Sequence, residues 1–167
     1  MREPPTAFCP TAPPCEGGTS FFAVNLQMPP MPKGRPRYTR TGRPYTPKRT
    51  REWEQLAAKL LYQSSLGFQS SPDSGPIGVA LTFIHKRPKR LCRKSDPDGR
   101  LWRPIKGRGG DLDNQIKSIL DACQAGRLIE DDAQVVELWA RDLWGAKDEE
   151  GHIMLHLYSM YDPVNPE

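Results

Sequence analysis

Proline and glycine restrict regular structure in this chain to a few separate segments. Seven such residues follow one strand-like run within a short stretch: Pro88, Pro97, Gly99, Pro104, Gly107, Gly109 and Gly110. Proline fixes φ and removes a backbone donor, and glycine weakens helices and strands, so we expect a loop without regular elements here. Helices and strands must therefore lie on either side of this loop.

Both ends of the chain are also poor in hydrophobic periodicity. Residues 1–18, MREPPTAFCPTAPPCEGG, have clustered prolines, and we expect a disordered tail there. A length of 167 residues suits one domain, which we place at residues 19–162, followed by a short tail over 163–167. The chain has neither the apolar core of a signal peptide nor a run of about 18 apolar residues. We therefore expect a cytoplasmic protein without a membrane span.

A strand, a helix and a second strand are expected before the loop. The run SFFAVNLQM (20–28) is typical of a strand. Thr46 and Pro47 suit an N-cap and a first helical residue. Apolar residues then recur at helical spacing at Trp53, Leu56, Ala57, Leu60 and Leu61. The run IGVALTFIHK predicts a strand with one apolar face, made of Ile77, Val79, Leu81 and Phe83.

A helix and two strands are expected after the loop. The helix has an apolar stripe and ends near Gly126, and the stripe consists of Leu112, Ile116, Ile119, Leu120 and Cys123. Strands near 133–143 and 152–160 follow, and the turn GAKDEEG between them predicts a hairpin. The order β-α-β-loop-α-β-β predicts an α+β fold with a mixed sheet and packed helices.

Charge is segregated along the chain although the total is only +4. Residues 31–51 and residues 85–110 each carry a net charge of +8, so the rest of the chain carries −12. Basic loops on an acidic body favour a polyanionic partner, and nucleic acid fits this pattern. Two disordered basic linkers are the alternative explanation.

The cysteines and histidines do not indicate a metal site. The four cysteines lack C-x-x-C spacing and a histidine at ligand spacing, so we expect free thiols at Cys9, Cys15, Cys92 and Cys123. His152 and His156 are four residues apart in a strand, a separation of roughly 13 Å that one ion cannot bridge.

The acids that follow the basic loop indicate a cation site instead. Asp111 and Asp113 begin the second helix, and the acids of EDD (130–132) precede a strand. Acids in a first helical turn also offset the helix dipole, which is the simpler explanation. However, carboxylates bind Mg²⁺, and Mg²⁺ assists phosphodiester cleavage by polarising water and absorbing charge. Since the helix reverses the chain, we expect one acid of EDD to join Asp111 and Asp113.

Together these motifs resemble the RusA family of Holliday junction resolvases. The runs PKGRPR, GRPYTP, WE, GDLDNQIKSILDACQAG and EDDAQVV occur in the order typical of that family, over about residues 20–160. The resemblance implies that Asp111, Asp113 and Asp132 are catalytic and bind Mg²⁺, with Mn²⁺ as a possible substitute. It also implies that Lys117 positions phosphate or water. Asp131 is the alternative to Asp132, because EDD leaves the register open.

The resemblance further implies a homodimer that resolves four-way DNA junctions by paired nicks in recombination and repair. Branched DNA is the expected partner, and no small-molecule cofactor is expected. The basic residues expected to contact DNA lie in the two basic segments and are Lys33, Arg35, Arg37, Arg40, Arg43, Arg87, Lys89, Arg90, Lys106 and Arg108. The dimer surface is expected either at the strands over 133–160 or on the apolar face of the first helix.

Two other hypotheses belong to different classes of protein. A non-catalytic DNA-binding protein would use the same fold and basic loops, with Asp111 and Asp113 serving only the helix start. An interaction protein would recruit another factor through its tail and acidic face. The three acids together with Lys117 favour the nuclease, because a DNA-binding protein gains nothing from acids that face phosphate. Unlike Asp111, Asp113 and Asp132, we expect Asp121 and Asp142 to tolerate replacement by Asn.

Overall fold

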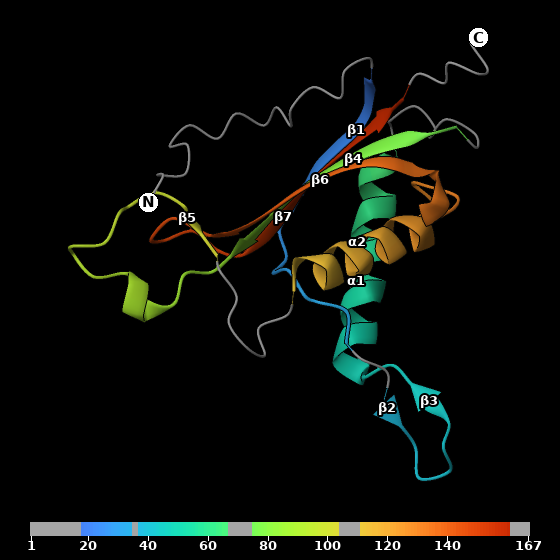
Figure 1. The fold of residues 1–167 in the computed structure, drawn as a ribbon, viewed down its shortest axis with the longest axis horizontal. Coiled ribbons are helices and arrows are strands. Elements are labelled where there is room, and N and C mark those ends of the chain that lie inside the picture. The colour runs from blue at the N-terminus through green and yellow to red at the C-terminus, as the bar shows by residue number, and fades with distance from the viewer. Residues whose placement is uncertain (1–17, 35–36, 67–74, 104–110, 161–167) are drawn as a thin grey trace.

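A five-stranded mixed sheet forms the centre of the protein (Figure 1). The computed structural model describes residues 18–34, 37–66, 75–103 and 111–160, so the predicted tails lie almost wholly outside the described residues. The sheet has the order β1-β7-β4-β6-β5. Its strands are β1 (Thr19–Leu26), β4 (Ile77–His85), β5 (Leu101–Trp102), β6 (Val135–Trp144) and β7 (His152–Ser159). The mixed sheet and the α+β class confirm the prediction from sequence.

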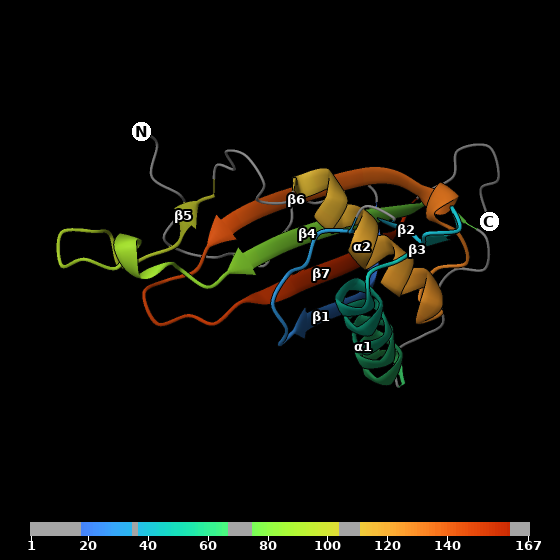
Figure 2. The ribbon, with the colours of Figure 1, turned by 90° about the horizontal axis from the view of Figure 1, so that it is seen from below.

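Both helices lie on the same face of this sheet (Figure 2). They are α1 (Lys48–Ser65) and α2 (Leu112–Ala125), and they pack against each other as well as against the strands. The hydrophobic core lies between the helices and the sheet, and it includes Trp53, Leu61, Phe83, Ile119 and Leu155. No helix in the described parts of the chain is long and apolar enough to cross a membrane.

Strand β4 lies between β6 and β7, so the predicted terminal hairpin is wrong. β4 pairs with β6 in parallel and with β7 in antiparallel orientation. Residues Ile77 to Ile84 are all buried, not only the four that were expected on one face. A continuously apolar strand is buried on both faces when it occupies the centre of a sheet. The hydrophobicity of β4 therefore explains why it separates the last two strands.

Some element boundaries and exposures also differ from the predictions. Pro47 is the N-cap of α1, and no side chain caps this helix, so Thr46 does not have the predicted role. Leu56 is 49% exposed although its spacing suggested the core. The first basic segment, residues 31–51, contains β2 (Arg37–Tyr38) and β3 (Pro44–Tyr45), which form a separate two-stranded sheet that was not expected.

Arg87 organises the loop that follows β4. Its guanidinium donates to the carbonyl oxygens of Gly145 (2.8 Å) and Pro97 (2.6 Å), and it also bonds to the carbonyls of Leu91 and Gly99. These contacts explain why the loop contains a short 3₁₀ helix, η1 (Lys89–Leu91), and strand β5 despite its prolines and glycines. Arg87 is only 4% exposed, so its side chain has a structural role in this loop that the predicted DNA contact did not include.

Gly126 allows the close approach of the two helices. It is buried at the C-cap of α2, where the sequence predicted the helix to end. A Cβ at this position would lie 2.9 Å from the carbonyl oxygen of Ala58 in α1 and 3.0 Å from that of Ala122. Both neighbours are backbone atoms, so they cannot move aside without displacing a helix. Glycine is therefore required by space at this position.

Replacing Gly126 by Ala is expected to destabilise the fold by about 1–3 kcal/mol, since the methyl group must push the helices apart. The change in the free energy of unfolding can be measured by urea denaturation. Ala125→Ser on the exposed side of the same helix end is the control and should change stability by less than about 0.5 kcal/mol. An unaltered urea midpoint for Gly126→Ala would contradict the proposed close approach.

Cys92 and Cys123 are free thiols, as expected, whereas Cys9 and Cys15 lie outside the described residues. Burial raises the pKa of the Cys123 thiol to about 12, so this side chain stays protonated in the core.

His156 contacts Ser20 and Tyr158 through its ring nitrogens. Burial lowers the pKa of His156, which agrees with a structural role.

Candidate active site

The first two candidate acids lie at the start of α2. Asp111 is the N-cap residue, with extended backbone, and its carbonyl oxygen accepts from the N–H groups of Asn114 and Gln115. Its carboxylate makes no capping hydrogen bond to the helix. Asp113 occupies the first turn, and both side chains are exposed. The simpler role of Asp111 as a side-chain cap is therefore not observed, and its carboxylate is open to solvent.

Lys117 lies next to Asp113 on the same face of α2. Its Nζ is 3.3 Å from Oδ2 of Asp113, as expected for residues four positions apart in a helix. The two side chains are 61% and 64% exposed, so this ion pair contributes little to stability. The ammonium group is thus held near the acids at small energetic cost and is available to a ligand.

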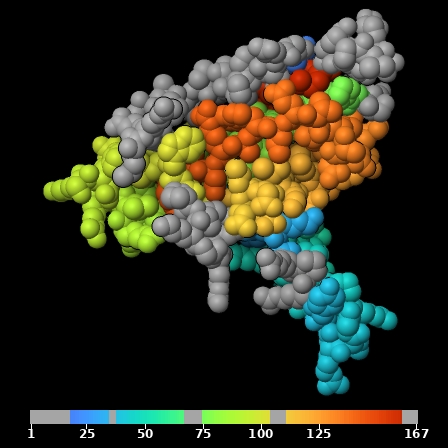
Figure 3. Space-filling view, viewed as in Figure 1, coloured from blue at the N-terminus to red at the C-terminus, as the bar shows by residue number. Residues whose placement is uncertain are grey.

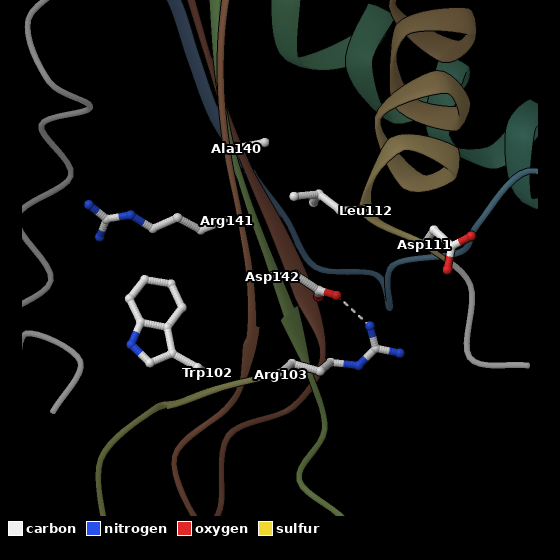
Figure 4. A pocket seen from close by; sticks show the side chains of 7 residues that line it. All are labelled: Trp102, Arg103, Asp111, Leu112, Ala140, Arg141 and Asp142. Carbon is white, nitrogen blue, oxygen red and sulfur yellow. Dashed lines mark hydrogen bonds and ion pairs between the residues drawn. The ribbon is translucent and has the colours of Figure 1, made fainter. Parts of the chain in front are cut away.

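A groove of about 470 Å³ adjoins this helix start (Figure 4). Its lining comes from α2 and its N-cap, from the end of β5 and from β6, and consists of Trp102, Arg103, Asp111, Leu112, Ala140, Arg141 and Asp142. Figure 4 shows Asp111 and Leu112 on one side of β6, together with Asp142 and Arg103, and Trp102 and Arg141 on the other side. Asp111 therefore lies close to the last third of β6.

A buried polar network forms one wall of the groove. Asp142 Oδ2 accepts from Arg103 Nη1 (2.5 Å) and from Gln115 Nε2 (3.2 Å). His85 Nε2 is 2.8 Å from Gln115 Oε1 and 3.0 Å from Asp142 Oδ1. The side chains of Asp142 and Arg103 are only 8% and 10% exposed. Sequence reasoning missed this network, which gives the Asp142 carboxylate a structural role that the expectation of a tolerated Asn did not include.

The third candidate acid belongs to a short 3₁₀ helix, η2 (Asp132–Gln134), between α2 and β6. Asp131 caps this helix, because its carboxylate accepts the N–H of Ala133 at 2.8 Å. That hydrogen bond, together with one to the Asp132 side chain, lowers the pKa of Asp131. Asp131 thus has a local structural role, whereas Asp132 is exposed and does not cap the helix. This difference favours Asp132 over Asp131 as the motif acid.

The three acids do not meet within one chain. Asp111 precedes α2 and Asp132 follows it, and a helix of 14 residues separates its ends by about 21 Å. Among the residues that the structure describes, no three acids, histidines or cysteines form a group that could hold a metal. The expected convergence is therefore wrong for a single chain, since the helix that reverses the chain also separates Asp111 from Asp132.

Several predicted DNA contacts have exposed side chains. Arg40 and Arg43 lie on and beside the turn between β2 and β3, and Lys89 and Arg90 lie in η1. Lys33 instead forms an ion pair with Asp121 of α2. The remaining predicted contacts fall where the side chain is not described, and these are Arg35, Arg37, Lys106 and Arg108.

The first basic segment, residues 31–51, is attached to α2. The N–H of Lys33 donates to the carbonyl oxygen of Asn114 at 2.9 Å, and the Lys33–Asp121 pair adds a second connection. The β2–β3 hairpin follows a few residues later. The exposed basic residues of the hairpin and the acids Asp111 and Asp113 are therefore connected through α2.

A comparison with protein families identifies the chain. The model of the family described as endodeoxyribonuclease RusA matches residues 27–156. The chain belongs to the RusA family. The matched region contains the two basic segments, Lys117 and all three motif acids. Membership supports endonuclease activity on DNA. No curated protein matches the chain.

Proposed function

We propose that this RusA family member is a Mg²⁺-dependent endodeoxyribonuclease that resolves Holliday junctions by paired nicks. The observation that carries the proposal is the pair of exposed carboxylates, Asp111 and Asp113, with Lys117 beside them, inside the family match. Such a nuclease acts in DNA recombination and repair as a homodimer. Branched DNA would be its partner.

The two carboxylates at the start of α2 provide part of the ligand set that Mg²⁺ requires. Mg²⁺ commonly takes one or two carboxylates and keeps several waters and phosphate oxygens. Asp111 and Asp113 are the residues that would hold it, and Asp132 of the same chain is too distant to join them. When bound, Mg²⁺ supplies charge stabilisation and an activated water. Lys117 would place its ammonium group against a phosphate oxygen next to the two acids.

The β2–β3 hairpin would provide the main contact with the DNA backbone. It extends away from the sheet and the helices (Figure 1). Arg40 and Arg43 offer exposed guanidinium groups, which bind phosphates well. Tyr38 and Tyr45 are 71% and 45% exposed, so their rings are accessible for stacking on unpaired bases at a junction.

The proposed activity is tested with a labelled four-way junction and a linear duplex of the same sequence, each with and without Mg²⁺. We expect paired, symmetric nicks in the junction only when Mg²⁺ is present. Cleavage of both DNAs at equal rates would refute selectivity for junctions. Tight junction binding without cleavage under Mg²⁺ and Mn²⁺ would instead favour the non-catalytic DNA-binding protein.

Replacing Arg40 and Arg43 by Ala together is expected to weaken junction binding and to lower the salt dependence. The slope of log K against log salt should fall by roughly 0.9 per lost phosphate contact. Gel-shift titrations from low to moderate salt measure this slope. Lys59→Ala on the exposed face of α1 is the control and should leave the slope unchanged. Equal slopes for the double variant and wild type would exclude the hairpin from the interface.

A further inference from the structure

A buried amide attaches the first turn of α2 to the sheet. The side chain of Gln115 is buried, with the residue only 1% exposed, whereas Asp111 and Asp113 in the same turn are exposed. The fully buried apolar side chains of α2 all lie in its second half and are Ile119, Ala122 and Cys123. The apolar core therefore holds the end of the helix most firmly, and a polar side chain holds its start.

Gln115 connects α2 to two strands at once. Its Oε1 is 2.8 Å from Nε2 of His85 in β4, and its Nε2 donates to Oδ2 of Asp142 in β6 at 3.2 Å. Nε2 of His85 also lies 3.0 Å from Oδ1 of Asp142, so this nitrogen faces two oxygens and carries a proton. Figure 3 shows α2 directly beside β6 at the surface. Turning the amide over would leave buried polar atoms unpaired, so Gln115 has one favoured orientation.

The same carboxylate oxygen also holds the end of β5. Oδ2 of Asp142 accepts from Arg103 Nη1 as well as from Gln115, and the N–H of Arg103 donates to the carbonyl oxygen of Asp142 at 3.1 Å. Along the sequence, Arg103 precedes residues 104–110 and Asp111 follows them. Asp142 therefore anchors the chain on both sides of this segment, immediately before the two acids.

We propose that Asp142 and Gln115 are positioning residues that determine where the carboxylates of Asp111 and Asp113 stand for a cation, an inference that rests on the proposed function. Both acids belong to the turn that Gln115 holds, because the N–H of Gln115 donates to the carbonyl oxygen of Asp111 at 3.2 Å. The Asp111 carboxylate makes no capping hydrogen bond, so the backbone of this turn determines its place. A misplacement of about 1 Å can cost about a hundredfold in rate.

Gln115→Met tests the positioning, because methionine is similar in length and flexible but makes neither hydrogen bond. Single-turnover cleavage of the four-way junction should fall by about ten- to a hundredfold, while junction affinity in gel shifts stays unchanged. Gly126→Ala at the other end of α2 is the matched control. It also loses stability but keeps the first turn attached, so it should cleave at close to the wild-type rate. Equal losses of cleavage in the two variants would overturn the proposal.

Asp142 is tested by comparing Asn with Leu at this position. Asn keeps one side-chain oxygen that can accept from Gln115 and Arg103, whereas Leu has none. Asp142→Asn should therefore cleave at close to the wild-type rate, and Asp142→Leu should lose as much cleavage as Gln115→Met. Circular dichroism identifies the temperatures at which the variants are folded, and if Asp142→Leu does not fold, Gln115→Met decides. Equal losses for Asn and Leu would overturn the role of this oxygen.

Hydrogen exchange reports on the first turn without cleavage or metal. In Gln115→Met, the amides of residues 114–116 should exchange at least about tenfold faster than in wild type, while those of residues 122–126 keep their protection. Gly126→Ala should instead loosen residues 122–126. A uniform loss of protection along α2 in Gln115→Met would mean that Gln115 only stabilises the fold, and the proposal would fail.

Binding of Mn²⁺ to the protein without DNA, measured by electron paramagnetic resonance, separates this inference from the proposed function. Asp111→Asn should weaken Mn²⁺ binding, and Gln115→Met should weaken it by about tenfold, since residues that orient metal ligands have effects of this size. If Asp111→Asn binds Mn²⁺ as wild type does, the proposed cation site fails, and hydrogen exchange still decides whether Gln115 fixes the turn. If Asp111→Asn weakens binding but Gln115→Met does not, the cation site stands and the positioning role fails.

Discussion

Asp113→Asn is expected to reduce junction cleavage by at least about a thousandfold, or about 4 kcal/mol of transition-state stabilisation, while binding is retained. The amide has nearly the same shape as the carboxylate but lacks the charge that a divalent cation requires. The exposed position of Asp113 leaves the fold intact. Because the acid also repels phosphate, junction affinity should stay equal or increase. Single-turnover cleavage and gel shifts measure the two effects separately.

Asp121→Asn is the matched control on the same helix. Asp121 pairs with Lys33 at a half-exposed position, and such a pair contributes about 0–1 kcal/mol. Its replacement should therefore change cleavage by no more than a few fold. Cleavage by Asp113→Asn at the wild-type rate would remove Asp113 from the site. Loss of binding together with cleavage would indicate that Asp113 supports the DNA contact instead.

The part of the site at the start of α2 was predictable from sequence, because residues close together along the chain determine it. The end of α2 near Gly126 and the position of Asp111 and Asp113 follow from helical periodicity and turn residues. Of the predicted apolar stripe, Ile119 and Cys123 are buried, and the other three residues pack against the core at partly buried positions. The i, i+4 spacing likewise places Lys117 beside Asp113. A few consecutive residues determine each of these features, so no knowledge of the remaining fold is needed.

The position of Asp132 depended on tertiary packing and was not predictable in this way. The sequence indicates that α2 reverses the chain, but it does not say how far the helix extends along the sheet. α2 ends near the beginning of β6, so Asp132, in the 3₁₀ helix that leads into this strand, lies at the end of β6 remote from Asp111. The same limitation applies to β4, whose place between β6 and β7 results from long-range pairing.

Asp142 shows why a polar residue in a strand is hard to interpret from sequence. From the sequence of β6 alone, Asp142 could equally face solvent, and its neighbours along the chain do not indicate a partner for its carboxylate. Its partners, His85, Arg103 and Gln115, come from β4, the end of β5 and α2. Three elements must be assembled before the carboxylate is enclosed, so the requirement for an acid here is a property of the fold.

Asp142→Ala is expected to destabilise the protein by about 3–5 kcal/mol, because removal of one partner leaves a buried guanidinium without its carboxylate. Gln115 also loses an acceptor for its amide. Urea denaturation near neutral pH measures the change in unfolding free energy. Asp148→Ala, at an exposed acid in the turn before β7, is the control and should cost less than about 0.5 kcal/mol.

A double-variant cycle separates the ion pair from general loss of packing. If Arg103 and Asp142 act as a unit, Arg103→Ala/Asp142→Ala should be less destabilised than the two single changes added together, by about 1 kcal/mol or more. The second substitution then removes the guanidinium whose carboxylate partner the first one removed. Strict additivity would mean that Asp142 stabilises the fold through His85 and Gln115 alone. The groove wall beside Asp111 would in that case persist without Arg103, and junction cleavage by Arg103→Ala should remain close to wild type.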